Sequence, residues 1–291
     1  MTGRPRLWFT SALYRRNRLR HDSKPEQVPT YQSLFPVQTT QTTSYIEEAS
    51  HIYDNLQICK YIKKWVSEDD LVWTRDAEGQ YYLARVTSGW EYWTTHEAID
   101  LDIDVANIFR CDIKNVDIDA VPGKVVSCFR ATRTIQEIAD EKAREYSKKL
   151  WNMLSNKEFY QIDKSKYSDI FMMLDAEETE DLLFLYLQSL GWHVVPHSRK
   201  RDTMSFEYLL VNPVSGERAL SQVKTGGVTL NRDDYAHYPY KIFLFQSNDR
   251  YAGGSARNVV CVSRGDLLTF LNKSLDWIPK SFKAKVELIN K

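Results

Sequence analysis

Residues 206–224 contain two apolar runs, Phe206-Glu-Tyr-Leu-Leu-Val211 and Ala219-Leu-Ser-Gln-Val-Lys224, separated by Asn212-Pro-Val-Ser-Gly216. The β-branched and aromatic residues of the runs predict strands at about 204–211 and 218–224. The Asn, Pro and Gly residues between them are typical of a turn. The segment therefore predicts a β-hairpin, and the rest of its domain can be worked out from this hairpin.

The polar residues of the hairpin are the candidates for a catalytic site. Side chains alternate across a strand, so Gln222 and Lys224 share one face, and the hairpin would bring Glu207 beside them. The Glu207 carboxylate, the Gln222 amide oxygen and the Val223 carbonyl could hold Mg²⁺, or Mn²⁺ in its place, because hard cations take oxygen ligands. Lys224 could orient the attacking water and neutralise developing charge. The sequence therefore predicts metal-assisted hydrolysis of a phosphodiester bond.

An α/β domain is expected around the hairpin from about residue 168. A helix is predicted at 176–190, because Asp175 is a suitable N-cap and Gly191 a suitable C-cap. The other predicted elements are strands at 192–196, 241–246 and 258–262, a short helix at 231–237, and a helix at 264–271 capped by Ser263. This order of elements predicts a central mixed sheet.

The order of these elements and the motif Glu-x14-Gln-x-Lys resemble the PD-(D/E)xK nuclease superfamily, and within it the Mrr-type restriction endonucleases with a Gln-x-Lys variant. The matching residues are Glu180-Asp-Leu-Leu-Phe-Leu-Tyr-Leu-Gln-Ser-Leu-Gly-Trp192, Phe206-Glu207 and Leu220-Ser-Gln-Val-Lys-Thr-Gly226, within about 168–275. The resemblance implies a restriction-endonuclease-like fold and Mg²⁺-dependent DNA cleavage.

The same resemblance implies the roles of four residues. They are Glu207 as the metal-binding acid, Gln222 at the second ligand position, Lys224 as the catalytic lysine, and Glu180 as the acid of the preceding helix. Glu177 is the alternative to Glu180. The superfamily commonly has Asp where this chain has Glu207, and Asp202 is a second candidate, although its place in a basic run favours a loop.

Basic residues near this site in the sequence suit a polyanionic backbone. The candidate contacts to nucleic acid are Arg199, Lys200, Arg201, Thr225 and Arg232. The predicted partner is DNA, and the sequence leaves RNA open.

The chain has 291 residues and no formal net charge, because 39 Lys and Arg balance 39 Asp and Glu. The charges are nevertheless segregated. Basic residues outnumber acidic ones by seven to one in 1–24 and by six to three in 194–232, whereas 97–119 has seven acidic residues and two basic ones. Zero net charge therefore does not argue against a nucleic acid partner.

A small β-barrel is predicted between about residues 69 and 130, where short aromatic and β-branched runs alternate with turns. Its segments Asp70-Leu-Val-Trp73 and Tyr82-Leu-Ala-Arg-Val86 resemble SH3-like barrels of the Tudor and PWWP kind. The resemblance implies an aromatic cage for a cationic ligand. The candidate cage residues are Trp73, Tyr82, Trp90 and Tyr92, with core packing as the alternative role for these rings.

The predicted fold class is thus α+β with two domains, an SH3-like barrel followed by a restriction-endonuclease-like domain. The expected segments are a basic arm and linker at 1–44, a helix and barrel at 45–133, a linking helix and connector at 134–167, and the nuclease-like domain at 168–291. The linking helix is expected at 135–154, because Thr134 and Glu137 have capping-box spacing. The last barrel strand is expected at 124–129.

Other classes of protein are disfavoured. The four cysteines form no C-x-x-C pair, which disfavours a zinc ribbon and favours reduced thiols in the cytoplasm. His193 and His197 lie on an expected strand, not on the helix that a zinc clamp needs. No apolar run approaches the ~18 residues of a membrane-spanning helix.

The function that we expect from the sequence is a Mg²⁺-dependent DNA endonuclease of restriction or anti-phage defence, with an N-terminal recognition or control domain. A homodimer would supply the two sites that a double-strand cut needs, and a protein of the same defence system would be a further partner. The alternative is a non-catalytic adaptor, with a degenerate nuclease fold, that binds nucleic acid or a protein partner.

Overall fold

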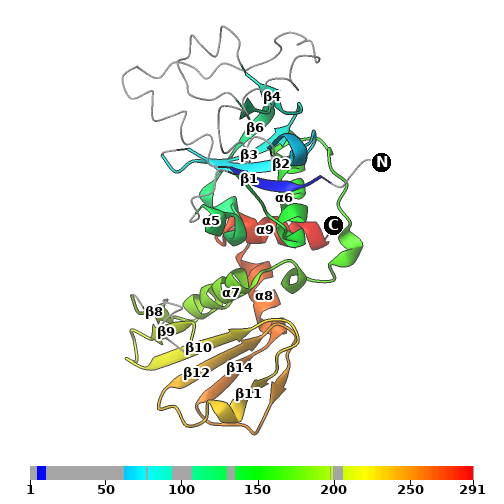
Figure 1. Cartoon of the computed structure of the whole chain (residues 1–291). Coiled ribbons are helices and arrows are strands. Elements are labelled where there is room, and N and C mark those ends of the chain that lie inside the picture. Colours follow the sequence, from blue (N-terminus) through cyan, green and yellow to red (C-terminus); the bar gives the residue numbers. More distant parts are fainter. Residues whose placement is uncertain are drawn as a thin grey trace, which may run out of the picture. The chain divides into compact units, whose positions relative to one another are not determined.

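The computed structural model describes residues 5–10, 62–76, 78–93, 107–129, 135–196, 198 and 206–290. The chain has a mixed α+β fold (Figure 1) and divides into two compact units, Met1–Ile162 and Asp163–Lys291. Among the described residues, no helix is long and apolar enough to cross a membrane.

An open five-stranded sheet, in the order β6-β3-β2-β1-β7, forms the centre of the first unit. Its strands are β1 (Leu7–Thr10), β2 (Leu71–Arg75), β3 (Tyr81–Val86), β6 (Cys111–Val116) and β7 (Ile135–Glu137). β1 is parallel to β2, and the other neighbours are antiparallel. A separate pair consists of β4 (Glu91–Tyr92) and β5 (Asn107–Ile108). The described strands therefore form an open sheet and close no barrel.

The strand β1 lies within the segment that the sequence assigned to a basic arm, and Asp70 holds it in place. The Asp70 carboxylate is buried and accepts hydrogen bonds from the Arg6 amide and the Trp8 indole, both at 2.7 Å, and from the Ser67 amide at 3.1 Å. Hydrogen bonds to a charged group are about twice as strong as neutral ones. The carboxylate therefore compensates for its own burial and fixes β1 beside β2.

Two predicted elements of the first unit are corrected. The predicted strand at 124–129 is the helix α5 (Gly123–Cys128), which buries Val125 and Cys128, three residues apart. Burial of one helical face outweighs the β propensity of the valines there. The predicted helix at 135–154 begins later, as α6 (Glu141–Ser155), because residues 135–137 pair with β1 and Asp140 caps the helix instead.

Around the predicted hairpin, the second unit forms a mixed five-stranded sheet in the order β14-β12-β10-β9-β8. The strands are β8 (His193–Val194), β9 (Tyr208–Val211), β10 (Arg218–Lys224), β12 (Lys241–Gln246) and β14 (Val259–Val262). β9 is antiparallel to β10, whereas β10, β12 and β14 are parallel. The predicted hairpin and mixed sheet are confirmed.

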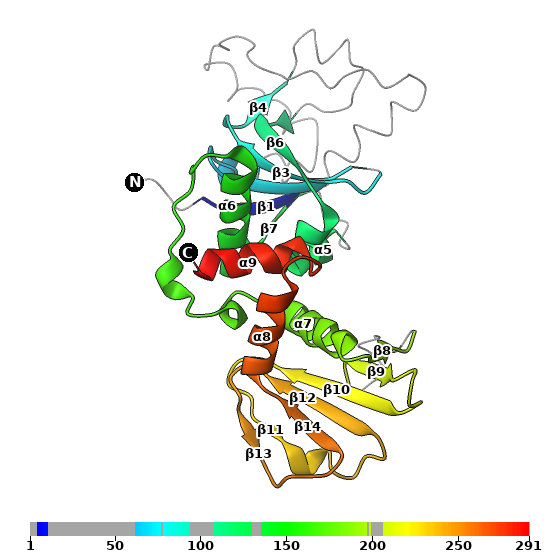
Figure 2. The same cartoon turned by 180° about the vertical axis from the view of Figure 1, so that it is seen from behind.

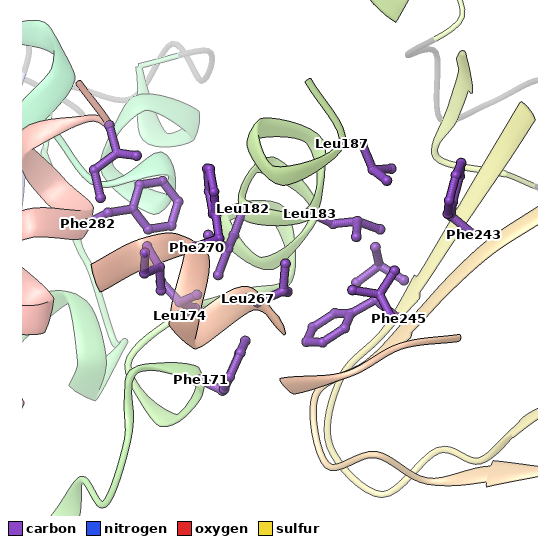
Figure 3. Close-up of a cluster of buried hydrophobic side chains, with 14 of the residues drawn as sticks. Phe171, Leu174, Leu182, Leu183, Leu187, Phe243, Phe245, Leu267, Phe270 and Phe282 are labelled. Carbon is purple, nitrogen blue, oxygen red and sulfur yellow. The ribbon is translucent and has the colours of Figure 1, made fainter. Parts of the chain in front are cut away.

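Three helices of this unit, α7 (Ala176–Ser189), α8 (Arg264–Ser274) and α9 (Lys280–Asn290), contribute to its main apolar core. Figures 1 and 2 show α7 and α8 on one side of the sheet and β11 on the other. In the core, Leu183 of α7 and Leu267 of α8 lie toward Phe245 of β12, and Leu182 of α7 lies beside Phe270 of α8 (Figure 3). Ala219 and Val223 belong to the same core, so the odd-numbered residues of β10 face the helices.

The opposite face of the sheet is covered by a second layer of short elements. These are β11 (Leu230–Asn231), the 3-10 helix η4 (Arg232–Asp234) and β13 (Tyr251–Ala252). Leu220 and Leu244 pack there against Phe206. By alternation, Gln222 and Lys224 belong to this face. The helix predicted at 231–237 is reduced to η4, whose cap is Asn231.

Two short 3-10 helices also precede α7, η2 (Lys164–Lys166) and η3 (Ile170–Met172), and another, η1 (Ile118–Ala120), precedes α5.

Candidate active site

Glu207 and Gln222 are brought together where β9 begins beside β10. The Glu207 amide donates to the Ser221 carbonyl at 2.9 Å, which continues the ladder by one residue beyond β9. The Gln222 side chain, only 4% exposed, donates from Nε2 to Glu207 Oε1 at 3.0 Å. The sequence-predicted proximity of the carboxylate and the amide is therefore present.

The Val223 carbonyl is the third member of this group. The Ser221 carbonyl points toward β9, where it accepts the Glu207 amide. Carbonyls two residues apart on a strand point the same way. The Val223 carbonyl therefore points to the same side, at a level that lies beyond the first residue of β9. Gln222 Nε2 also lies 3.3 Å from the Val223 oxygen. One amide group thus lies between a carboxylate and a carbonyl.

These donor atoms fit a hard cation. Rotating the Gln222 amide by half a turn exchanges its NH₂ group and its oxygen, so that three oxygens from three residues would converge. Repulsion among those oxygens favours the NH₂ group between them, and a divalent cation would favour the oxygen. No three His, Cys, Asp or Glu side chains form a metal cluster in the described part of the chain. The metal site predicted here differs from such a cluster, because Glu207 is its single carboxylate and the other two ligands are the Gln222 and Val223 oxygens.

A Gln222→Glu variant tests the fit of this set to a cation. Without metal it places two carboxylates about 3 Å apart and removes the donor to Val223, which we expect to cost the second unit about 1–3 kcal/mol. Mg²⁺ or Mn²⁺ should restore this stability, and should do so more than in the wild type. Thermal unfolding in EDTA and in increasing metal measures both effects. The Gln222→Leu variant is the control, since it removes the hydrogen bonds without adding charge, and its unfolding should not respond to metal.

Lys224 is the last residue of β10 and lies on the Gln222 side of the sheet. It is partly exposed, and its ammonium makes no hydrogen bond or ion pair with the residues that the structure describes. Its neighbour across the parallel register is Gln246 of β12. A lysine at this position is available to a phosphate or a water molecule that approaches the end of the strand.

The predicted helix acid, Glu180 or its alternative Glu177, does not lie on the same face of the sheet as Gln222 and Lys224. Glu177 and Glu180 belong to α7, whose apolar side packs on the face of the sheet opposite to Gln222 and Lys224. The described approach of α7 to β9 involves Asp181, whose carboxylate lies 3.5 Å from the Tyr208 hydroxyl. The sequence analysis did not name Asp181 as a candidate, although it directly follows Glu180 in the chain. The contacts do not assign Glu180 to the group formed by Glu207 and Gln222.

Of the predicted nucleic acid contacts, Thr225 and Arg232 are described. Thr225 is partly exposed directly after Lys224. Arg232 donates to the Cys261 sulfur at 3.2 Å and to the Gly253 carbonyl at 3.0 Å, and it lies over the Tyr251 ring. Those bonds give Arg232 a structural role within the second unit. Arg199, Lys200, Arg201 and Asp202 lie outside the described residues.

Sequence reasoning missed the fully buried Gln246, whose side chain joins the loops that follow β10 and β12. A sequence signal was present: Gln246 directly follows the apolar run Ile242–Phe245 of β12, and it is in register with Lys224.

The candidate cage residues of the first unit occupy unlike environments. Trp73 is fully buried, and its indole donates to Ser147 Oγ at 2.9 Å, so it has no surface for a ligand. The Tyr82 hydroxyl donates to the buried Asp76 at 2.8 Å, and burial together with this bond raises the pKa of Tyr82 to about 12.

Trp90 and Tyr92 are partly exposed. The Trp90 indole donates to Asn107 Oδ1 at 3.1 Å, and Lys63 Nζ lies 5.0 Å from the centre of its ring. A cation of the chain itself thus already lies against one face of Trp90.

Comparison of the chain with protein-family models, with curated proteins and with solved structures gives no match. The candidate site therefore rests on the geometry of its residues.

Proposed function

We propose that the chain is a metal-dependent endonuclease that hydrolyses phosphodiester bonds in DNA. The observation that carries the proposal is the convergence of Glu207, Gln222 and the Val223 carbonyl, with Lys224 two residues beyond Gln222 on the same face. A carboxylate and neutral oxygens for a hard cation, with a nearby ammonium, suit attack of water on a phosphate diester.

In this proposal, Glu207, Gln222 and Val223 hold Mg²⁺, or Mn²⁺ in its place. When bound, the cation would supply charge neutralisation at the phosphate and help to activate water. Lys224 holds the attacking water or a non-bridging phosphate oxygen by a charge-assisted hydrogen bond. Thr225 lies next to it along the path of the strand. Glu180 is proposed only as a more remote helix acid, since α7 lies on the other face.

The order of elements in the second unit supports the restriction-endonuclease-like assignment. A capped helix, an antiparallel pair bearing the acid and the Gln-x-Lys sequence, and two further parallel strands follow each other along the chain. We propose for the protein a role in restriction or defence against invading DNA, in the cytoplasm, either as a homodimer or with a protein of the same system.

For the first unit we propose recognition or control. An SH3-like ligand site there would use Tyr82, Trp90 and Tyr92, since Trp73 is buried. The Lys63 ammonium beside Trp90 is then a competitor for a cationic ligand.

Supercoiled plasmid DNA provides the test. We expect the full chain to nick or linearise it with Mg²⁺ or Mn²⁺ and to leave it intact with EDTA. Glu207→Gln should lower the rate by about 100-fold or more, because the only carboxylate of the proposed metal set is lost while the shape is kept. A parallel reaction with single-stranded RNA distinguishes the two nucleic acids. Metal-dependent cleavage that survives Glu207→Gln would contradict the site, and salt-dependent binding without cleavage would favour the adaptor.

A further inference from the structure

Two loops meet at one edge of the sheet in the second unit. Because β10 and β12 are parallel, the loop 225–229 after β10 and the loop 247–250 after β12 leave the sheet at the same edge. Ser247, the first residue of the second loop, donates its amide at 3.0 Å to the carbonyl of Lys224, the last residue of β10. In open α/β sheets, ligands bind outside the carboxyl ends of parallel strands.

The buried side chain of Gln246 ties these loops into one rigid body. Its Nε2 atom donates to the Gly226 and Val228 carbonyls, each at 2.9 Å. Its Oε1 atom accepts from the Asn248 amide at 2.6 Å and the Arg250 amide at 3.0 Å. These four bonds use both donors and both acceptor positions of the amide group. The loops are therefore held in a fixed arrangement before any ligand arrives.

Arg250 supplies a positive charge on this rigid platform. It is exposed, its Nη1 atom lies 3.4 Å from the Gly227 carbonyl, and it has no carboxylate partner among the described residues. The neighbouring Asp249 carboxylate instead accepts the Arg264 amide at 3.1 Å. Arg250 thus keeps most of its five donors for a ligand, next to the loop that follows Lys224.

The loop itself offers a backbone donor. Gly227 is exposed, and in the described part of the chain its amide donates to no other group. The Val228 amide lies trans to the Gly227 carbonyl that faces Arg250, so it points away from the arginine. Exposed amides beside an arginine fork are typical phosphate ligands, since both donate to phosphate oxygens.

We propose that Arg250 and the amide of Gly227 form a subsite for one phosphate of the nucleic acid backbone, beside the phosphate that Lys224 approaches. The inference rests on the proposed function, which it deepens by naming residues that hold the strand. Arg250 is a binding residue: it holds the strand near Lys224 and Glu207 and contacts no atom of the diester that is cleaved.

Binding of a short labelled DNA duplex to the full chain in EDTA tests the subsite without cleavage. Arg250→Gln should weaken binding about tenfold and reduce the slope of log K against log salt by about 0.9, as expected for the loss of one phosphate contact. Arg250→Lys should recover part of the affinity. Arg257→Gln is the matched control, because Arg257 is also exposed but precedes β14, at the opposite edge of the sheet. It should change binding less than twofold.

Equal effects of Arg250→Gln and Arg257→Gln on affinity and salt slope would overturn the subsite, as would a wild-type chain that does not bind DNA. If the wild type cleaves DNA, Arg250→Gln should raise KM and leave kcat within about twofold, since the contact is equally strong in the bound substrate and in the transition state. Absence of cleavage together with the expected binding loss would refute the nuclease and support the subsite. The two proposals therefore fail separately.

Discussion

Lys224→Ala is expected to lower DNA cleavage by about 1,000-fold, because the variant loses the ammonium of β10 that lies on the same face of the sheet as Gln222. The loss should be in kcat, since the proposed contact of Lys224 strengthens as charge develops on the phosphate. Affinity for DNA in EDTA should fall much less. Single-turnover cleavage of a plasmid with saturating Mg²⁺ measures the chemical step directly.

Two further variants separate charge from packing. Lys224→Met keeps the aliphatic stem of the side chain, so it should be as inactive as Lys224→Ala and as stable as the wild type. Lys241→Met is the control on the neighbouring strand: Lys241 begins β12, pairs with Glu217 at 3.0 Å, and lies at the other edge of the sheet. It should cleave at the wild-type rate. Full activity of Lys224→Met would remove Lys224 from the mechanism.

Lys285→Met is expected to destabilise the second unit by about 3–5 kcal/mol, because it leaves the Glu178 carboxylate buried without its cation. Lys285 on α9 and Glu178 on α7 form an ion pair, with side chains only 3% and 9% exposed. Glu178 also completes the capping box of α7 by accepting the Asp175 amide at 3.1 Å. The ion pair therefore joins the last helix to the first turn of α7.

The double variant Glu178→Gln/Lys285→Met makes this prediction specific. It removes the pair together, keeps an acceptor for the Asp175 amide, and should recover most of the stability lost in Lys285→Met. Lys283→Met, at an exposed position of the same helix, should change stability by no more than about 0.5 kcal/mol. Denaturant unfolding of the four proteins gives all the differences. A double variant as unstable as Lys285→Met would show that burial of the methionine, not the unpaired carboxylate, is responsible.

The elements of the second unit were predictable because their signals are local. α7 begins after Asp175 and α8 after Ser263, each with a complete capping box. In the sequence, both caps directly precede a segment whose apolar residues recur with helical spacing. β12 has the predicted bounds, Lys241–Gln246, since its apolar run ends at polar residues on both sides. The contact of Glu207 with Gln222 followed from the hairpin alone.

What could not be predicted depends on partners far away in the chain. β7 was taken for the start of a helix because its three residues reveal no strand until β1 is known to lie beside them. Glu180 on α7 was expected in the same site as Gln222. The apolar periodicity of a helix shows which of its sides is buried, but it does not show which face of the sheet the helix covers. Likewise, burial of Gln246 depends on two loops that meet only in three dimensions.

The position of β1 has a consequence for how the first unit assembles. β1 is an internal strand, in register with β2 at Leu7 and Leu71 on one side and with β7 on the other. The hairpin of β2 and β3 can form early from nearby residues, whereas β1 must close a loop of more than fifty residues before β7 has a neighbour to join. A chain that lacks residues 1–10 would therefore leave β7 unpaired and expose an apolar strand edge on β2, a template for association between chains.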